Sequence, residues 1–325
     1  MRFIVSILLV LASLVTANSQ QQTQQDKLHA EGYEALYNLD YEGARRRFQK
    51  MVELAPDDPS GAQCLASSLW LRQLNESYEL KATLYSSTES KTKTDRRPTD
   101  EFRKWIRQAK SLSEARLKKE PRNLEALYYL GAAEGLEAAY TASVERKYVA
   151  AMRAGNNSVE HHREVLKASP DYYDAELTIG LHNYVVGSLS LPLKMIAGTM
   201  GVRGSKKRGI EALERVAVKG KWARDLAGIL LVDLYKREKR WSDAVRMARQ
   251  LSEKYPRNYL FKLQMAEALT SQIVTLRKTK TPLKTEESEL QNIFSALSRD
   301  KSFEPATRDL INQRWTLARQ QLSQH

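Results

Sequence analysis

The sequence predicts an all-α protein built from antiparallel helix hairpins, and two features indicate this fold class. From Lys27 onward, apolar residues recur at helical spacing, and few valine- or isoleucine-rich runs alternate with the period of a strand. Helical stretches are also separated by very short turns, as between residues 27–40 and 41–54, and Pro56 ends the second of these. Helices joined by so few residues are expected to pack as antiparallel neighbours.

The first hairpin shows the expected division of faces. Ala44, Phe48 and Met51 recur at helical spacing and share one side of the helix over 41–54. Three consecutive arginines, residues 45–47, are spread around the same helix. We interpret their charge as a solvated surface rather than an anion-binding arm.

The spacing within this hairpin resembles the tetratricopeptide repeat (TPR), a helix-turn-helix unit of about 34 residues. The small, aromatic, small, aromatic and proline places of that motif are filled in register by Gly32, Tyr41, Ala44, Phe48 and Pro56. A second match late in the chain consists of Tyr235, Trp241, Ala244, Ala248 and Pro256. The resemblance implies a right-handed superhelical TPR-like α-solenoid over residues 27–325, completed by helices over 286–300 and 305–322.

The start of the chain predicts export. Residues 1–17 combine Arg2, an apolar run and small closing residues, which is the layout of a secretory signal cleaved after Ala17. The glutamine-rich residues 18–26 are expected to form a flexible polar leader. Because the apolar run is shorter than a membrane span, we expect a mature chain without one. Its expected location is the periplasm in a Gram-negative bacterium, and otherwise outside the cell.

Two segments are expected to interrupt the regular hairpins. Residues 87–100 lack apolar side chains, which predicts an exposed, mobile loop. Residues 123–152 are too long for a standard first helix, so we expect a lengthened hairpin whose break lies near residues 153–158.

Residues 185–209 depart furthest from the repeat, because they contain five of the chain's 14 glycines as well as Pro192. This irregular insertion resembles the centre of a TPR family that includes the yeast inclusion-body clearance protein and exported bacterial look-alikes. The matching residues are Gly180, Asn183, Pro192, Gly201, Gly204, Lys207 and Gly209. The family usually carries an acidic residue where this chain has Ser205 and Lys206. The resemblance implies a scaffold without a catalytic centre.

Taken by its residues alone, the insertion has three interpretations. It is a buried segment packed against the solenoid, a segment lying in a membrane interface, or a turn whose backbone amides cradle a phosphate at residues 201–204. The chain lacks the sheet and the Walker spacing that nucleic-acid and nucleotide binding would need.

The sequence favours a protein that is not an enzyme. It contains no G-x-S-x-G, H-E-x-x-H, paired CxxC or dinucleotide motif, and we expect no cofactor. His161 and His162 are adjacent and point about 100° apart on a helix, so they are interpreted as exposed polar residues rather than metal ligands. Cys64, the only cysteine, is expected to be buried in a helix.

The expected function is binding of a protein or peptide on the concave face of the TPR array. In TPR arrays this face is lined by the first helix of each hairpin. Carrying that geometry over gives the candidate residues Tyr33, Tyr37, Asn183, Tyr184, Asp233, Lys236 and Arg237. The tyrosines have an alternative role, in which they pack against the next hairpin. The alternative function is a basic adaptor for anionic envelope surfaces or polyanions, suggested by the formal net charge of +13 and the basic residues near 203–208.

Overall fold

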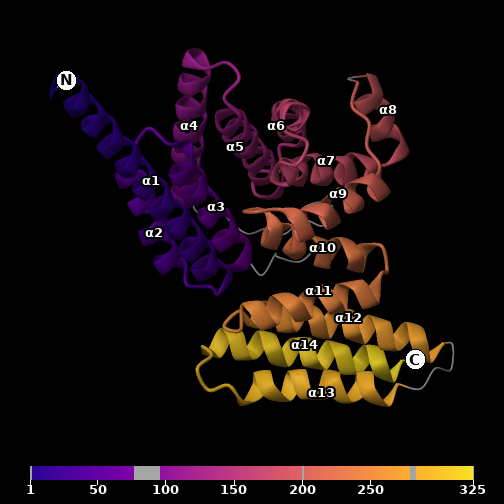
Figure 1. Ribbon diagram of the computed structural model, residues 1–325. Coiled ribbons are helices and arrows are strands. Elements are labelled where there is room, and N and C mark those ends of the chain that lie inside the picture. Colours follow the sequence, from indigo (N-terminus) through magenta and orange to yellow (C-terminus); the bar gives the residue numbers. More distant parts are fainter. Residues whose placement is uncertain (1, 77–95, 200, 279–282, 325) are drawn as a thin grey trace. The chain divides into compact units, whose positions relative to one another are not determined.

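The computed structural model describes residues 2–76, 96–199, 201–278 and 283–324, which form two compact units. Unit 1 is Met1–His182 and unit 2 is Asn183–His325, and the helix α7 crosses the boundary. In the described residues every regular element is a helix (Figure 1). The helices that lie in unit 1 or begin there are α1 (Arg2–Tyr37), α2 (Tyr41–Leu54), α3 (Pro59–Glu76), α4 (Arg96–Lys119), α5 (Leu124–Ser143), α6 (Tyr148–Ala168), the short η1 (Tyr173–Ala175) and α7 (Glu176–Ser188). The remaining helices of unit 2 are α8 (Leu191–Thr199), α9 (Lys206–Lys219), α10 (Arg224–Arg237), α11 (Trp241–Lys254), α12 (Tyr259–Arg277), α13 (Lys284–Arg299) and α14 (Pro305–Ser323).

Helices that follow one another along the chain pack side by side, which confirms the predicted all-α fold of consecutive hairpins. In the first hairpin the motif residues have the expected roles. Phe48 is fully buried, and a Cβ added at Gly32 would lie 2.2 Å from the Cε1 atom of its ring. Ala44 is also fully buried. A small residue on α1 therefore makes room for an aromatic residue on α2.

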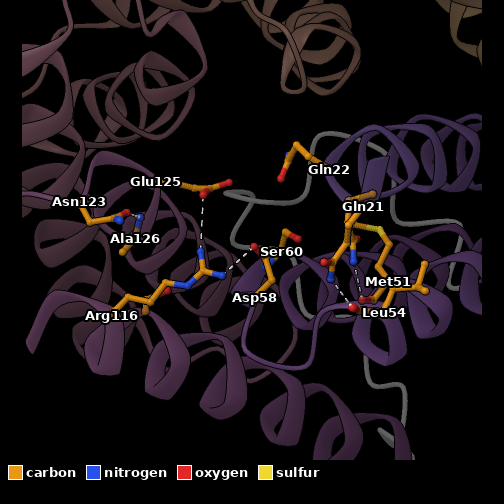
Figure 2. A network of polar contacts seen from close by, with 12 residues as sticks. Gln21, Gln22, Met51, Leu54, Asp58, Ser60, Arg116, Asn123, Glu125 and Ala126 are labelled. Carbon is orange, nitrogen blue, oxygen red and sulfur yellow. Dashed lines mark hydrogen bonds and ion pairs between the residues drawn. The ribbon is translucent and has the colours of Figure 1, made fainter. Parts of the chain in front are cut away.

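The residues predicted as a flexible leader, 18–26, lie inside α1 instead. Gln21 donates a hydrogen bond to the carbonyl oxygen of Leu54 (2.6 Å), and Gln25 donates one to that of Met51 (2.9 Å). Both acceptors lie in the last turn of α2 (Figure 2), where the carbonyl oxygen of Met51 also accepts a hydrogen bond from the amide of Ala55. Polar glutamines thus extend the hairpin rather than interrupt it. Cleavage after Ala17 stays a prediction.

Neighbouring hairpins of unit 1 are joined at their ends by Arg116 of α4. Its guanidinium lies 3.0 Å from the carboxylate of Asp58, in the turn before α3, and 3.5 Å from that of Glu125, at the start of α5 (Figure 2). Nearby, the side chain of Asn123 accepts a hydrogen bond from the amide of Ala126 and caps α5. Arg116 of α4 therefore links the turn before α3 to the start of α5.

The break in the long hairpin is not where the sequence suggested. Residues 153–158 are helical and lie within α6, and the chain turns at 144–147. Arg146 has a φ of 58° there, a left-handed conformation that ends the helical path. Gly155 instead lies where α6 packs against its neighbours, since an added Cβ would be in van der Waals contact with Ala138 and His182. Most of the predicted loop 87–100 lies outside the described residues, and 96–100 open α4.

The irregular insertion, 185–209, contains the end of α7, all of α8 and the start of α9. Gly187 and Gly204 bring α7 close to the chain before α9. A Cβ on Gly204 would lie 2.6 Å from the backbone nitrogen of Gly187 and from the carbonyl oxygen of Asn183. The base of the insertion is thus closely packed. By contrast residues 191–195 and 198 of α8 are exposed, so the buried interpretation is wrong for these residues.

Replacing Gly204 by Ala is expected to destabilise the protein by about 1–3 kcal/mol, because the new methyl group meets backbone atoms that cannot move aside. Urea unfolding of the full chain measures the change. Gly198→Ala is the matched control: nothing lies within 4 Å of its Cβ position, so stability should be unchanged or rise by up to about 1 kcal/mol. Equal stability of the two variants would contradict the close approach.

Candidate partner-binding face

The face expected to bind a partner is formed by the first helices of successive hairpins, and we call it the first-helix face. In unit 1, α1, α3 and α5 lie next to one another on it. In unit 2, side-chain contacts connect α10, α12 and α14. Because each unit has its own such face, the candidate residues are described unit by unit.

Tyr33 and Tyr37 of unit 1 are engaged in packing. The Tyr33 ring lies 4.9 Å from His29, 5.6 Å from Tyr37 and 5.2 Å from Phe48, measured between ring centroids. Its hydroxyl interacts with Ser67 of α3, and burial raises its pKa well above the ordinary value. Tyr37 is only 4% exposed. These contacts match the alternative role, in which the tyrosines pack against the next hairpin, although Tyr33 is half-buried rather than buried.

Tyr184 of unit 2 is also buried, at 1% exposure. Its hydroxyl donates a hydrogen bond to Glu238 Oε1 (2.8 Å), which also accepts one from Lys206 Nζ (2.8 Å). Burial raises the pKa of Tyr184 to about 12. Burial also opposes ionisation of Glu238, but the two donors outweigh it and lower the pKa of that carboxyl. Lys206 therefore joins the start of α9 to the end of α10. Asn183 is half-buried beside the Gly204 turn.

Asp233 and Lys236 of α10 belong to an ionic cluster on the first-helix face of unit 2. Lys236 Nζ lies 3.5 Å from the carboxylate of Asp233 and 3.1 Å from that of Glu267 on α12. Arg314 on α14 lies 3.8 Å from the other oxygen of Glu267. The four side chains are 15–24% exposed. Two cations and two carboxylates thus connect three first helices.

Lys236 keeps its charge within this cluster. Burial alone would lower the pKa of Lys236, but the carboxylates of Asp233 and Glu267 raise it overall. Arg237, the remaining candidate, follows Lys236 and is half-buried. The face therefore presents fixed hydrogen-bond donors and acceptors of both charges, a chemistry suited to the polar groups of a polypeptide.

Sequence reasoning did not identify Glu267 and Arg314. A signal for Glu267 was present, since it follows Asp233 by 34 residues and therefore occupies the same place in the next repeat. Arg314 lies in α14, which was assigned as a cap, and no repeat spacing points to it. Its role depends on how α14 packs against α12.

The two adjacent histidines are not both exposed, contrary to expectation. His162 is 1% exposed, and its Nε2 group donates a hydrogen bond to the carbonyl oxygen of Tyr128 (3.0 Å) while Nδ1 contacts the hydroxyl of Thr178. His161 pairs with Glu134 at 2.8 Å, and this hydrogen bond raises its pKa. Within the described ranges, no group of three or more His, Cys, Asp and Glu side chains is placed to hold a metal ion.

Cys64 is fully buried in α3, which confirms its expected place, and burial raises the pKa of its thiol. In the part of the chain that the structure describes, no helix has both the length and the apolar composition needed to cross a bilayer.

No protein-family model and no curated protein matches the chain. Among solved structures, it is similar to a thermophilic TPR protein of Thermus thermophilus. The two share 16% sequence identity with a TM-score of 0.40, over 75% of this chain and 98% of that one.

Proposed function

We propose that the protein is a non-catalytic, exported interaction scaffold that binds a protein or peptide on the first-helix face of unit 2. The observation that supports this is the ionic cluster of Asp233, Lys236, Glu267 and Arg314, which joins three successive first helices. The family resemblance and the chain of hairpins agree with such a role. No cofactor takes part in it.

The cluster is a costly way to join helices. Bringing charged groups out of water is expensive, and well-packed apolar side chains often stabilise a protein as well or better. Charges that remain partly exposed on a face shared by α10, α12 and α14 are therefore better explained by recognition than by stability alone. Arg237 adds a further donor at the end of α10, beside the cluster in sequence.

The test compares the first-helix face with the opposite surface. A photo-reactive residue placed at 237 in the full chain should cross-link a partner in the native extract, and one placed at 246 on α11 should not. With that partner purified, Arg237→Ala should weaken its binding by at least about tenfold, because Arg side chains are frequent energetic centres of interfaces. Calorimetry measures the affinity.

Arg246→Ala is the matched control, since this arginine is 61% exposed on a second helix. It should change the affinity less than about twofold. Far-UV circular dichroism checks that both variants keep their helices. Equal losses in the two variants, or cross-linking only at 246, would show that the first-helix face is not the binding surface.

A further inference from the structure

Helix α8 exposes large apolar side chains to solvent. Leu191 is 78% exposed, Met195 is 74% exposed and Leu193 is 49% exposed. Leu191 and Met195 are four residues apart and share one side of the helix, whereas Leu193 points to the opposite side. Isolated exposed leucines are common on protein surfaces, but this nine-residue helix exposes large apolar side chains on both sides, and we call it the apolar tip.

This tip projects from a firmly packed base. Figure 1 shows α8 reaching beyond α9, and the side chains of residues 191–195 on α8 are exposed. A Cβ added at Gly198 or Gly201 would meet nothing within 4 Å. At the base, by contrast, Gly204 packs directly against the backbone of Gly187, and Val186 packs against Val202. The chain therefore holds an apolar helix in a defined position outside its core.

The stretch of chain that contains α8 carries charges of one sign only. Residues 177–210 contain no Asp or Glu. Lys194 on α8 is exposed, and so are the basic residues that follow it at the start of α9. Lys206 is paired with Glu238. Lys207 is 86% exposed and lies 4.0 Å from Glu211, at the limit of an ion pair. Arg203 and Arg208 are also exposed.

We propose that α8 and the adjoining basic residues form a docking site for an anionic lipid bilayer, with the apolar tip entering the headgroup region. The helix spans about 14 Å at 1.5 Å per residue, which is too short to cross a hydrocarbon core of about 30 Å. Apolar side chains beside a cationic surface are the combination that binds anionic membrane interfaces.

Other occupants fit these features less well. A second copy of the chain would bring this acid-free, basic run against itself, which like-charge repulsion opposes. A soluble polyanion would use the basic residues but leave Leu191 and Met195 in water. Only an anionic surface with an apolar layer beneath it pairs with the basic residues and also removes the apolar side chains from water. This site is separate from the first-helix face of unit 2, which keeps the role proposed above.

Vesicle binding of the full chain tests this site. Vesicles of phosphatidylcholine mixed with anionic phosphatidylglycerol should bind the protein at least about tenfold more strongly than phosphatidylcholine alone. The double variant Leu191→Ser/Met195→Ser should lower binding to the anionic vesicles by at least about tenfold, because it removes the inserting side chains. Co-sedimentation with the vesicles measures both effects.

Two controls separate this site from general surface properties. Val218→Ser removes an apolar side chain that is 74% exposed on α9, equal to Met195, and should change binding less than about twofold. Lys207→Gln should weaken binding more than Lys27→Gln, where Lys27 is 73% exposed on α1. Raising the salt concentration should reduce the contribution of the basic residues.

Three results would overturn the proposal. The first is equal binding to anionic and neutral vesicles, and the second is an equal loss in Val218→Ser and in the α8 double variant. The third is a dimer, seen by light scattering, that the double variant dissociates, because α8 would then be a contact between copies of the chain. None of these results bears on cross-linking at residue 237, so the two proposals fail separately.

Discussion

Phe48→Ala is expected to destabilise unit 1 by about 3–5 kcal/mol, the range for removing a buried aromatic side chain. Phe48 is fully buried, its ring packs against the backbone at Gly32, and it meets the Tyr33 ring edge-on at 5.2 Å. The loss should concentrate in α1 to α3, because helical repeats interact mainly with their neighbours. Hydrogen exchange of backbone amides, read helix by helix, measures it.

A double-mutant cycle shows whether the Gly32 contact is the cause. Gly32→Ala alone should be destabilising, because its Cβ would lie 2.2 Å from the Phe48 ring. In a Phe48→Ala background the same change should be nearly neutral, since the clash is gone. Tyr148→Ala, at a tyrosine that is 56% exposed, is the control and should have little effect. Additive effects of Gly32→Ala and Phe48→Ala would contradict this packing.

Acidification should reduce the stability of unit 1 through His162. Burial lowers its pKa from 6.5 to about 4, so the folded state favours the neutral ring. The contribution of neutral His162 to the free energy of unfolding is fully present above pH 6.5. It is lost as the pH falls from 6.5 towards 4, by about 3 kcal/mol in all. Urea unfolding at several pH values should show this slope, and His162→Gln should remove it.

The neighbouring histidine provides a control of opposite sign. The hydrogen bond with Glu134 raises the pKa of His161, so its stabilising effect is present below pH 6.5 and is lost as the pH rises through its folded-state pKa. His161→Gln should therefore make the acid-dependent loss larger, whereas His162→Gln makes it smaller. If both variants followed the wild-type pH dependence, neither ring would have the environment described above.

The repeat motif was predictable because its residues act within one hairpin. Gly32, Ala44 and Phe48 meet across two helices joined by a short turn, so their spacing along the chain already implies their contact. The sequence predicted the break at 153–158 rather than directly after α5, because glycine and asparagine occur both in turns and within helices. They favour turns, but here they lie within α6, and the turn is made by Arg146 instead.

The binding site stays a prediction, but the structure shows the surroundings of its residues. Lys236 of α10 contacts Glu267 of α12, whereas the hydroxyl of Tyr184 is bonded to Glu238, a residue far along the chain. Whether a tyrosine on a first helix faces solvent or the next hairpin depends on the neighbouring helix. Periodicity places a residue on a side of its own helix and carries no information about what covers that side.

By itself, the sequence determined the helical class, the pairing of helices into hairpins and the unusual composition of residues 185–209. These properties follow from local spacing and from turn residues. The tertiary structure alone decided that His162 is buried, that Glu267 and Arg314 complete the ionic cluster, and that α8 is exposed. The physical reason is that burial and ion pairing depend on which helices meet in space, and those helices are separated by long stretches of chain.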